Sequence, residues 1–285
     1  SLCFLLFYYN DTYRQRSAGI YRKKKWRMRI AANLSIMFQR VDLLQRYEKA
    51  ASMGFRCVEV SIPYSQPAEK LKAQADLFNL QHILINSPPG DWLKGDRGIA
   101  AIPTRKNDFD EALETAVKYA NTLAVKKIHV MAGIISVNDE AKRTYVDNIR
   151  AASRRFAKDG IMCLIEPINH ISIPGYFLST YEQAVDVIKE INEPNLKIMF
   201  DIFHAQQICG KLAHSIASLK SYIGHVQVAQ VPDRHEPDSD GEINYKYIFE
   251  ILKKNGDWDV GCEYSETGDT AEYVKWVHAN GLVFE

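Results

Sequence analysis

Short apolar runs alternate with longer amphipathic stretches from Arg29 onward, and this alternation predicts eight strands, each followed by a helix. Most of the apolar runs are continuous, which is typical of parallel strands buried on both faces. The predicted strands are Arg29 to Leu34, Cys57 to Ile62, His82 to Asn86, Lys127 to Met131, Met162 to Ile168, Lys197 to Asp201, His225 to Ala229 and Asp259 to Tyr264. The predicted helices are Val41 to Met53, Pro67 to Asn79, Thr104 to Leu123, Asp139 to Lys158, Thr180 to Ile191, His204 to Leu219, Tyr245 to Lys254 and Thr270 to Ala279.

The repeated strand and helix units predict a closed barrel. Gly54, Gly160 and the pair Asn255-Gly256 each follow a helical stretch, where residues that tolerate a left-handed backbone end helices. No low-complexity linker divides the chain. We therefore predict an α/β fold, a single (β/α)8 TIM barrel over residues 28–285, rather than an open doubly wound sheet. The long loop from Ser87 to Pro103 is a candidate lid.

The first 27 residues differ from the rest of the chain. An apolar run from Leu2 to Tyr9 precedes a basic run from Arg22 to Lys25, which is the reverse of the order in a secretory signal. A mitochondrial presequence is one interpretation of this arginine-rich segment. We favour the alternative that residues 1–27 are a disordered or non-native extension and that the folded domain starts at Met28.

Charge and composition narrow the classes of protein. Residues 1–28 carry a net charge of +6, whereas the remainder carries −5, so a nucleic acid is not an expected partner. No apolar run approaches the roughly 20 residues that span a bilayer, so we expect a soluble protein without a membrane partner. The five cysteines form no CxxC pair, which favours reduced thiols in the cytoplasm. Homo-oligomerisation stays open.

Polar residues end four of the late predicted strands, at Glu166, Asp201, Gln227 and Glu263. In a TIM barrel the carboxyl ends of the strands meet at one mouth, where the chemistry lies. Carboxylates that converge among apolar neighbours need a cation or protons, because an isolated buried charge is costly. Oxygen ligands favour Mg²⁺ or Mn²⁺ over structural zinc. Each acid taken alone is also explained as a helix cap or a rim residue, but four equivalent positions favour a site.

Seven segments resemble the hydroxypyruvate isomerase family of xylose isomerase-like TIM barrels, and they run in family order across nearly the whole chain from Met28. They are Ala32-Asn33-Leu34-Ser35, Ile85-Asn86-Ser87-Pro88-Pro89-Gly90-Asp91, His129-Val130-Met131-Ala132-Gly133, Glu166-Pro167-Ile168-Asn169, Asp201-Ile202-Phe203-His204, Gly224-His225-Val226-Gln227-Val228-Ala229 and Gly261-Cys262-Glu263-Tyr264. The resemblance implies that Glu166 and Glu263 are the catalytic acid/base pair. It also implies a divalent metal held by Glu166, Asp201, Gln227 and Glu263.

The resemblance implies an aldose-ketose isomerase, an intramolecular oxidoreductase that interconverts hydroxypyruvate and 2-hydroxy-3-oxopropanoate (tartronate semialdehyde). The reaction moves a proton between neighbouring carbons through an enediolate, whose charge the metal would stabilise. Because the substrate is a small 2-oxo acid, the site also needs a donor for its carboxylate, and Arg234 is the candidate. His204 is expected to hydrogen-bond a substrate oxygen, whereas Glu236 and Glu242 are interpreted as loop charges.

Three other functions fit parts of the pattern. An isomerase or epimerase of a longer keto-sugar acid, such as 2-oxo-tetronate, would use the same residues. An endonuclease IV-like phosphodiesterase would need more histidine and acidic ligands and a basic surface. A metal-free barrel that only binds a small acid would have no use for two opposed carboxylates.

Overall fold

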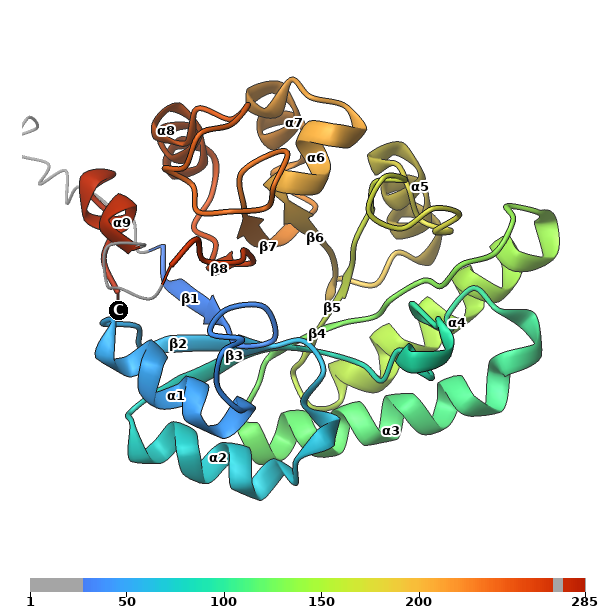
Figure 1. Ribbon diagram of the computed structural model, residues 1–285. Helices are drawn as coiled ribbons and strands as arrows, with labels where there is room; N and C mark the ends of the chain where they lie inside the picture. The colour runs from blue at the N-terminus through green and yellow to red at the C-terminus, as the bar shows by residue number, and fades with distance from the viewer. Residues whose placement is uncertain (1–27, 269–273, 285) are drawn as a thin grey trace, which may run out of the picture.

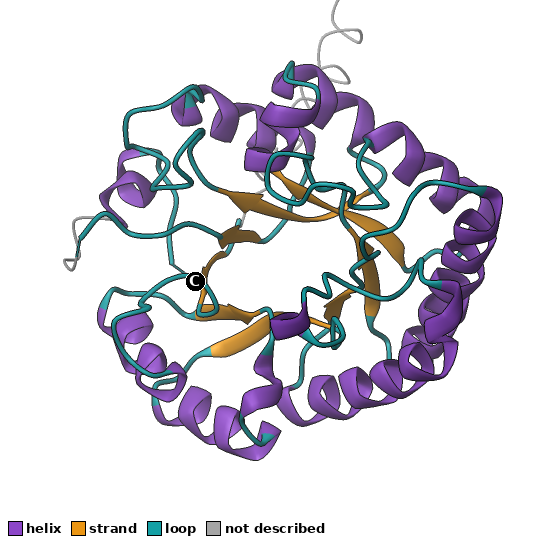
Figure 2. Cartoon of the chain, turned by 45° about the vertical axis from the view of Figure 1, so that its right-hand side comes forward, coloured by secondary structure: helices purple, strands orange, loops and turns teal. Residues whose placement is uncertain are grey.

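The computed structural model describes residues 28–268 and 274–284, and its eight parallel strands close into a barrel in the order β1 to β8. Figure 2 shows the strands as an inner ring with the helices around it. The predicted fold class is therefore confirmed. The strands are β1 Ile30–Asn33, β2 Cys57–Val60, β3 Gln81–Asn86, β4 Lys127–His129, β5 Met162–Ile165, β6 Leu196–Asp201, β7 Ile223–Val228 and β8 Val260–Cys262.

The helices follow the strands in sequence and lie on the outside of the barrel (Figure 1). The α-helices are α1 Leu43–Ser52, α2 Ala68–Leu77, α3 Lys106–Leu123, α4 Asp139–Ala157, α5 Tyr181–Ile191, α6 Ile202–Ile208, α7 Leu212–Leu219, α8 Tyr245–Asn255 and α9 Lys275–Ala279. Short 3-10 turns occur at η1 Pro63–Ser65, η2 Trp92–Lys94 and η3 Pro103–Arg105. Among the described residues, no helix is both long and apolar enough to cross a membrane.

One predicted helix, His204 to Leu219, is wrong, because the structure has two helices there. Gly210 and Lys211 both adopt left-handed backbone angles, with φ of 56° and 48°, which interrupt the helix after α6. The amphipathic pattern continues through the break, so periodicity alone did not reveal it. The start of the last predicted helix, Thr270 to Ala279, and the extension of residues 1–27 fall in part or wholly outside the described residues.

The main core lies between the strands and the helices. On α3, Phe109, Leu113, Ala116 and Ala120 recur every three or four residues and are all buried. Burying a leucine or phenylalanine side chain of this kind stabilises the fold by roughly 1.5–3 kcal/mol. The larger of the two apolar cores thus lies in the outer layer, between the strands and the helices.

A second, smaller apolar cluster, most of whose members face the barrel interior, is formed by Ala31, Cys57, Ile83, Leu84, Leu164 and Met199. Because side chains alternate along a strand, the residue two places after several of these also points inward. On β2, Cys57 is followed in this way by Glu59, and on β6, Met199 is followed by Asp201. On these two strands the inward-facing side chains therefore change from apolar to polar towards the mouth.

The loop from Ser87 to Pro103 is fastened to the barrel. The backbone N–H of Ser87 donates to the carbonyl of His129 at 2.8 Å, and that of Ala101 donates to Ala132 at 2.7 Å. Gly98 lies so close to the segment that follows β4 that a Cβ there would fall 2.3 Å from the carbonyl oxygen of Met131. With its φ of 101°, this position requires glycine. The loop therefore holds its side chains at fixed places over the mouth.

Candidate functional site

A cavity of about 570 Å³ opens at the carboxyl ends of the strands. Apolar side chains such as Ile36, Met131 and Ile168 form part of its wall. Its polar lining includes Asn86, His129, Glu166, His204, Arg234 and Glu263. A concave site that combines an apolar wall with a few converging polar groups suits a small molecule.

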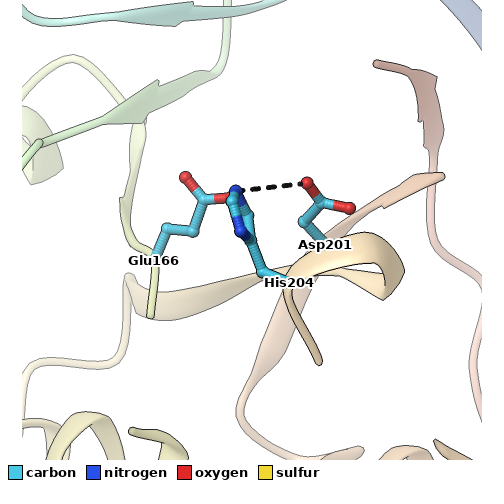
Figure 3. A group of neighbouring side chains, drawn as sticks. All are labelled: Glu166, Asp201 and His204. Atoms are coloured by element: carbon cyan, nitrogen blue, oxygen red, sulfur yellow. Dashed lines mark ion pairs between the residues drawn. The ribbon is translucent and has the colours of Figure 1, made fainter. Parts of the chain in front are cut away.

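The acids expected at the strand ends meet at this mouth. Glu166 follows β5, Asp201 ends β6 and Glu263 follows β8. One carboxylate oxygen of Glu166, one of Asp201 and a ring nitrogen of His204 all lie within 4.8 Å of one another. Figure 3 shows the two carboxylates on either side of the imidazole. The carboxylate oxygens of this buried group are able to bind a metal ion.

Arg234 lies among the carboxylates. Its Nη2 is 2.7 Å from Oε2 of Glu263 and 3.1 Å from Oδ2 of Asp201, and its Nε donates to the backbone carbonyl of Glu263 at 3.2 Å. Its backbone has a φ of 57°, a left-handed conformation that costs a residue with a side chain of order 1–3 kcal/mol. The fold accepts this strain where the guanidinium must reach two acids. One guanidinium does not balance three carboxylates.

Burial and mutual repulsion control the protonation of these acids. Burial raises the pKa of Glu166 well above its usual value, and the charges of Glu263 and Asp201 raise it further. Burial raises the pKa of Glu263 to about 8, against the opposing charge of Arg234. Burial also raises the pKa of Asp201. Carboxyl groups with raised pKa values in a cleft are typical of catalytic or cation-binding sites.

A neighbouring asparagine determines which nitrogen of His204 carries the proton. Asn169 Oδ1 accepts hydrogen bonds from the backbone N–H groups of Ile171 and Ser172, at 3.0 and 2.8 Å. Its Nδ2 must therefore be the atom 2.6 Å from Nδ1 of His204. Burial lowers the pKa of His204, which favours the neutral ring. Its Nδ1 then accepts, so the proton lies on Nε2, which faces Glu166 and Asp201 at 3.8 and 3.6 Å.

Gln227 lies beside Asp201 in the pairing of β7 with β6. Its Nε2 donates to Oε2 of Glu59 at 2.8 Å, which fixes the orientation of the amide. Its Oε1 is buried without a hydrogen-bond partner among the described residues, as is Oε1 of Glu166. Buried oxygens without a donor fit a cation, because leaving such atoms unpaired is costly.

A line of hydrogen bonds runs from Gln227 down through the barrel. Nε2 of His225 lies 2.5 Å from Oε1 of Glu59, and Nδ1 of His225 lies 3.2 Å from Nζ of Lys127. Because an ammonium group only donates, Nδ1 accepts and Nε2 donates to Glu59. Asn33 also donates to Glu59, at 3.3 Å. We call Lys127, His225, Glu59 and Gln227 the barrel axis.

The structure thus brings together Glu166, Asp201, His204, Arg234 and Glu263, with Gln227 next to Asp201. Sequence analysis missed Glu59, Asn169 and His129, all of which are buried. Glu59 is the one acid within the apolar run of β2, which was the available signal. Glu236, interpreted as a loop charge, is also buried, and it accepts a hydrogen bond from the backbone N–H of Thr267 at 2.7 Å.

Comparison with known proteins identifies the family. The family described as xylose isomerase-like TIM barrel matches residues 47–279. A Caenorhabditis elegans protein has the provisional name hydroxypyruvate isomerase. It is 48% identical over 90% of this chain and 98% of its own length. The hydroxypyruvate isomerase of Escherichia coli is 41% identical over 88% of this chain and 98% of its own.

The chain belongs to the hydroxypyruvate isomerase family of xylose isomerase-like TIM barrels. It is therefore an isomerase. A 2-oxo-tetronate isomerase from Cupriavidus necator is as similar, at 41% identity over 87% of this chain and 97% of its own. A crystal structure named AP endonuclease, family 2, from Brucella melitensis is 40% identical and superposes with a TM-score of 0.85 over 88% of this chain and 98% of its own.

Proposed function

We propose that this isomerase interconverts hydroxypyruvate and 2-hydroxy-3-oxopropanoate. The observation that carries the proposal is the pair of carboxyl groups, Glu166 and Glu263, that line one small cavity from different strands. The reaction removes a proton from the carbon bearing the hydroxyl group and returns one to the neighbouring carbon, through an enediolate. It therefore needs one ionised and one protonated carboxyl group beside the substrate.

Glu166 and Glu263 fill the two roles as an acid/base pair. Their raised pKa values and mutual repulsion favour a state in which the pair shares a proton, so one accepts while the other donates. In the reverse direction the roles exchange. The sum of protons on the pair is unchanged after each turnover, as an isomerisation requires.

We infer that Glu166, Asp201, Gln227 and Glu263 hold a divalent metal, Mg²⁺ or Mn²⁺. The unpartnered oxygens of Glu166 and Gln227 and the excess of carboxylates support this assignment. When bound, the cation supplies Lewis-acid stabilisation of the negative charge that develops on the substrate oxygens. His204 is a donor rather than a ligand in this proposal, because its Nε2 carries the proton while Asn169 bonds Nδ1.

His204 and Arg234 are proposed to contact the substrate. Nε2–H of His204 is directed at the space between Glu166 and Asp201, where it is able to donate to a substrate oxygen. Arg234 lines the cavity and balances part of the charge of Glu263 and Asp201. Both residues hold the acids and the substrate in place, which removes much of the entropic cost of reaching the reactive geometry.

Isomerisation or epimerisation of 2-oxo-tetronate, a four-carbon acid, is the second candidate. The similarity to the Cupriavidus necator enzyme favours it, and a cavity of about 570 Å³ takes either acid. Phosphodiester cleavage of the endonuclease type fits less well. It needs a larger set of metal ligands and a basic surface, whereas residues 29–285 carry a net charge of −5.

We also propose that residues 28–285 form the catalytic domain and that the protein works in the cytoplasm. Cys57, Cys163 and Cys262 are buried thiols, which suits a reducing compartment.

The deciding experiment is an assay of the purified full chain with hydroxypyruvate, 2-hydroxy-3-oxopropanoate and 2-oxo-tetronate, each with and without added Mg²⁺ or Mn²⁺. We expect cation-dependent turnover with the highest kcat/KM for hydroxypyruvate. A higher kcat/KM for 2-oxo-tetronate would select the second candidate. No turnover of any of the three acids would exclude both.

A further inference from the structure

Arg97, in the loop between β3 and α3, lines the cavity from the side of the ring opposite β7. We propose that Arg97 binds the carboxylate group of the substrate. The assignment rests on the proposed function in one respect, namely that the substrate is a small 2-oxo acid. In this arrangement the acids at the ends of β5, β6 and β8 lie at one side of the mouth, and the guanidinium of Arg97 lies at the other.

Arg234 cannot offer a carboxylate the paired donors that bind it best. A guanidinium binds a carboxylate most strongly through two parallel N–H groups, such as Nε and Nη2. In Arg234 both of these atoms are already bonded, Nε to the carbonyl of Glu263 and Nη2 to the side chains of Glu263 and Asp201. A substrate carboxylate placed there would also face both acids at close range, which is unfavourable.

Arg97 presents the opposite arrangement. Its Nη1 donates to the backbone carbonyls of Trp92 and Asp96, at 3.2 and 2.7 Å. Its Nε and Nη2 have no hydrogen-bond partner in the part of the chain that the structure describes, and no described carboxylate forms an ion pair with it. The paired donor edge of Arg97 is therefore available to a ligand.

The loop holds this guanidinium in place. The Cζ atom of Arg97 lies 3.8 Å from the centre of the Trp92 ring, a stacked cation–π contact. The adjacent Asp96 accepts from the backbone N–H of Asp91 at 2.7 Å and from Arg105 at 3.1 Å. Because Ala101 is bonded to Ala132 and Gly98 forms a bridge with the same residue, an anion would bind an arginine that has already lost most of its rotational freedom.

Other lining groups suit the same anion. Ser35, Ser61 and Ser65 place hydroxyl-bearing residues in the cavity wall. Arg46 also lines the cavity, but its Nε and Nη1 already donate hydrogen bonds to the backbone carbonyls of Val41 and Leu34. Arg46 therefore adds positive charge but leaves the paired contact to Arg97.

The test compares two ketones that differ in one group. Hydroxypyruvate and dihydroxyacetone share the reacting hydroxyketone, but only hydroxypyruvate has a carboxylate. We expect Arg97→Gln to lower kcat/KM for hydroxypyruvate by about ten- to a hundredfold, mostly through KM, because it removes a charge-assisted contact made throughout the reaction. Turnover of dihydroxyacetone should stay within about twofold, and Arg97→Lys should recover part of the loss.

The matched control is Arg143→Gln on the exposed side of α4, which should change neither substrate. Calorimetric titration of the Mg²⁺-loaded full chain with glycerate and glycerol separates this proposal from the proposed function, since it needs no turnover. Weaker glycerate binding in Arg97→Gln, with glycerol unchanged, supports the proposal. Equal glycerate affinity in both proteins, equal losses on both ketones, or no glycerate binding to the unmodified protein would overturn it.

Discussion

At the scale of the residue, burial comes first in setting the charge of each group at the mouth, and neighbouring charges come second. Burial lowers the pKa of His129 to about 3, with a further contribution from His225, so its ring is neutral at ordinary pH. Burial raises the pKa values of Glu166 and Glu263 instead, which favours the protonated form of each carboxyl group. In the absence of a bound cation, these shifts therefore favour neutral side chains at the mouth.

Removing one carboxyl group tests its part in proton transfer. We expect Glu166→Gln and Glu263→Gln each to lower kcat by about 10²- to 10⁴-fold, the usual contribution of a positioned acid or base. Glu166→Gln should leave the melting temperature unchanged, because burial already favours the neutral form of this carboxyl group. Glu263→Gln also removes an ion-pair partner of Arg234, so its melting temperature should fall. Glu242→Gln, on an exposed loop, is the control and should retain full activity. Normal turnover in either mouth variant would remove that residue from the mechanism.

The raised pKa values predict how the effect of metal removal on stability changes with pH. A carboxyl group such as Glu263, whose pKa is about 8 when folded and roughly 4.3 when unfolded, stabilises the fold at low pH and stops doing so as the pH rises through 8. The chelated protein should therefore lose stability from about pH 5 to pH 8. We expect the increase in melting temperature caused by Mg²⁺ or Mn²⁺ to grow over this range. A shift that is the same at pH 5.5 and pH 8 would contradict the metal assignment.

At the scale of the element, β2, β4 and β7 supply the residues of the barrel axis, and β8 leaves room for them. Gly261 on β8 is required here, because a Cβ at that position would lie 2.2 Å from a carboxylate oxygen of Glu59. Glu59 therefore occupies space in the barrel that β8, on the far side of β1 from β2, leaves open. The position of this carboxylate determines which atom of Gln227 faces the mouth.

Glu59→Gln tests this positioning role. The new amide has one acceptor oxygen where Glu59 accepts from His225, Gln227 and Asn33, so at least one donor is displaced. We expect a loss of about 1–3 kcal/mol in the free energy of unfolding and a several-fold weaker affinity for Mn²⁺, measured by electron paramagnetic resonance. Glu48→Gln, on the exposed face of α1, is the control. An unchanged affinity despite lower stability would limit Glu59 to a structural role.

Strand order and the acids at the strand ends were predictable from sequence, because an apolar run that ends in a carboxylate marks the carboxyl end of a buried strand. The pairing of Arg234 with Asp201 and Glu263 was not, since it depends on a left-handed turn in a loop. Glu59 was also missed: it stands out as the one acid in the apolar run of β2, but the run does not tell whether its side chain points into the barrel. Likewise, the break before α7 depends on two backbone angles within a continuous amphipathic pattern.

At the scale of the whole molecule, the two ends of the barrel have different tasks. At the end opposite the mouth, Asp259 pairs with Arg29 at 2.7 Å and with Lys127 at 2.5 Å. Although burial opposes its ionisation, the hydrogen bond from Arg29 and the charge of Lys127 lower the pKa of Asp259 below its usual value. We expect this end of the barrel to contribute stability, whereas the proposed catalytic groups lie at the mouth.

Asp259→Asn tests how much the ion pairs of Asp259 contribute to the free energy of unfolding, and how this contribution changes at acid pH. A depressed pKa stabilises the fold in full above the unfolded value of roughly 3.9, and the contribution is lost as the pH falls through the lower folded value. We expect the variant to be less stable than the unmodified protein by about 2 kcal/mol at pH 7, since two cations lose their partner. Urea unfolding should show this difference narrowing below about pH 4. A difference that stays constant with pH would mean that the ion pairs contribute little.

Lys127 connects the ion pairs at the end opposite the mouth to the barrel axis, because its ammonium group bonds both Asp259 and Nδ1 of His225. An engineer who replaced Lys127 with an apolar residue to harden the protein against heat would leave the buried Nδ1 of His225 without its donor. The imidazole would then be less firmly held, and so would the carboxylate of Glu59 that it bonds and that fixes the amide of Gln227. A thermostabilising change made on the far side of the molecule could thus silence the enzyme without touching any group that meets the substrate.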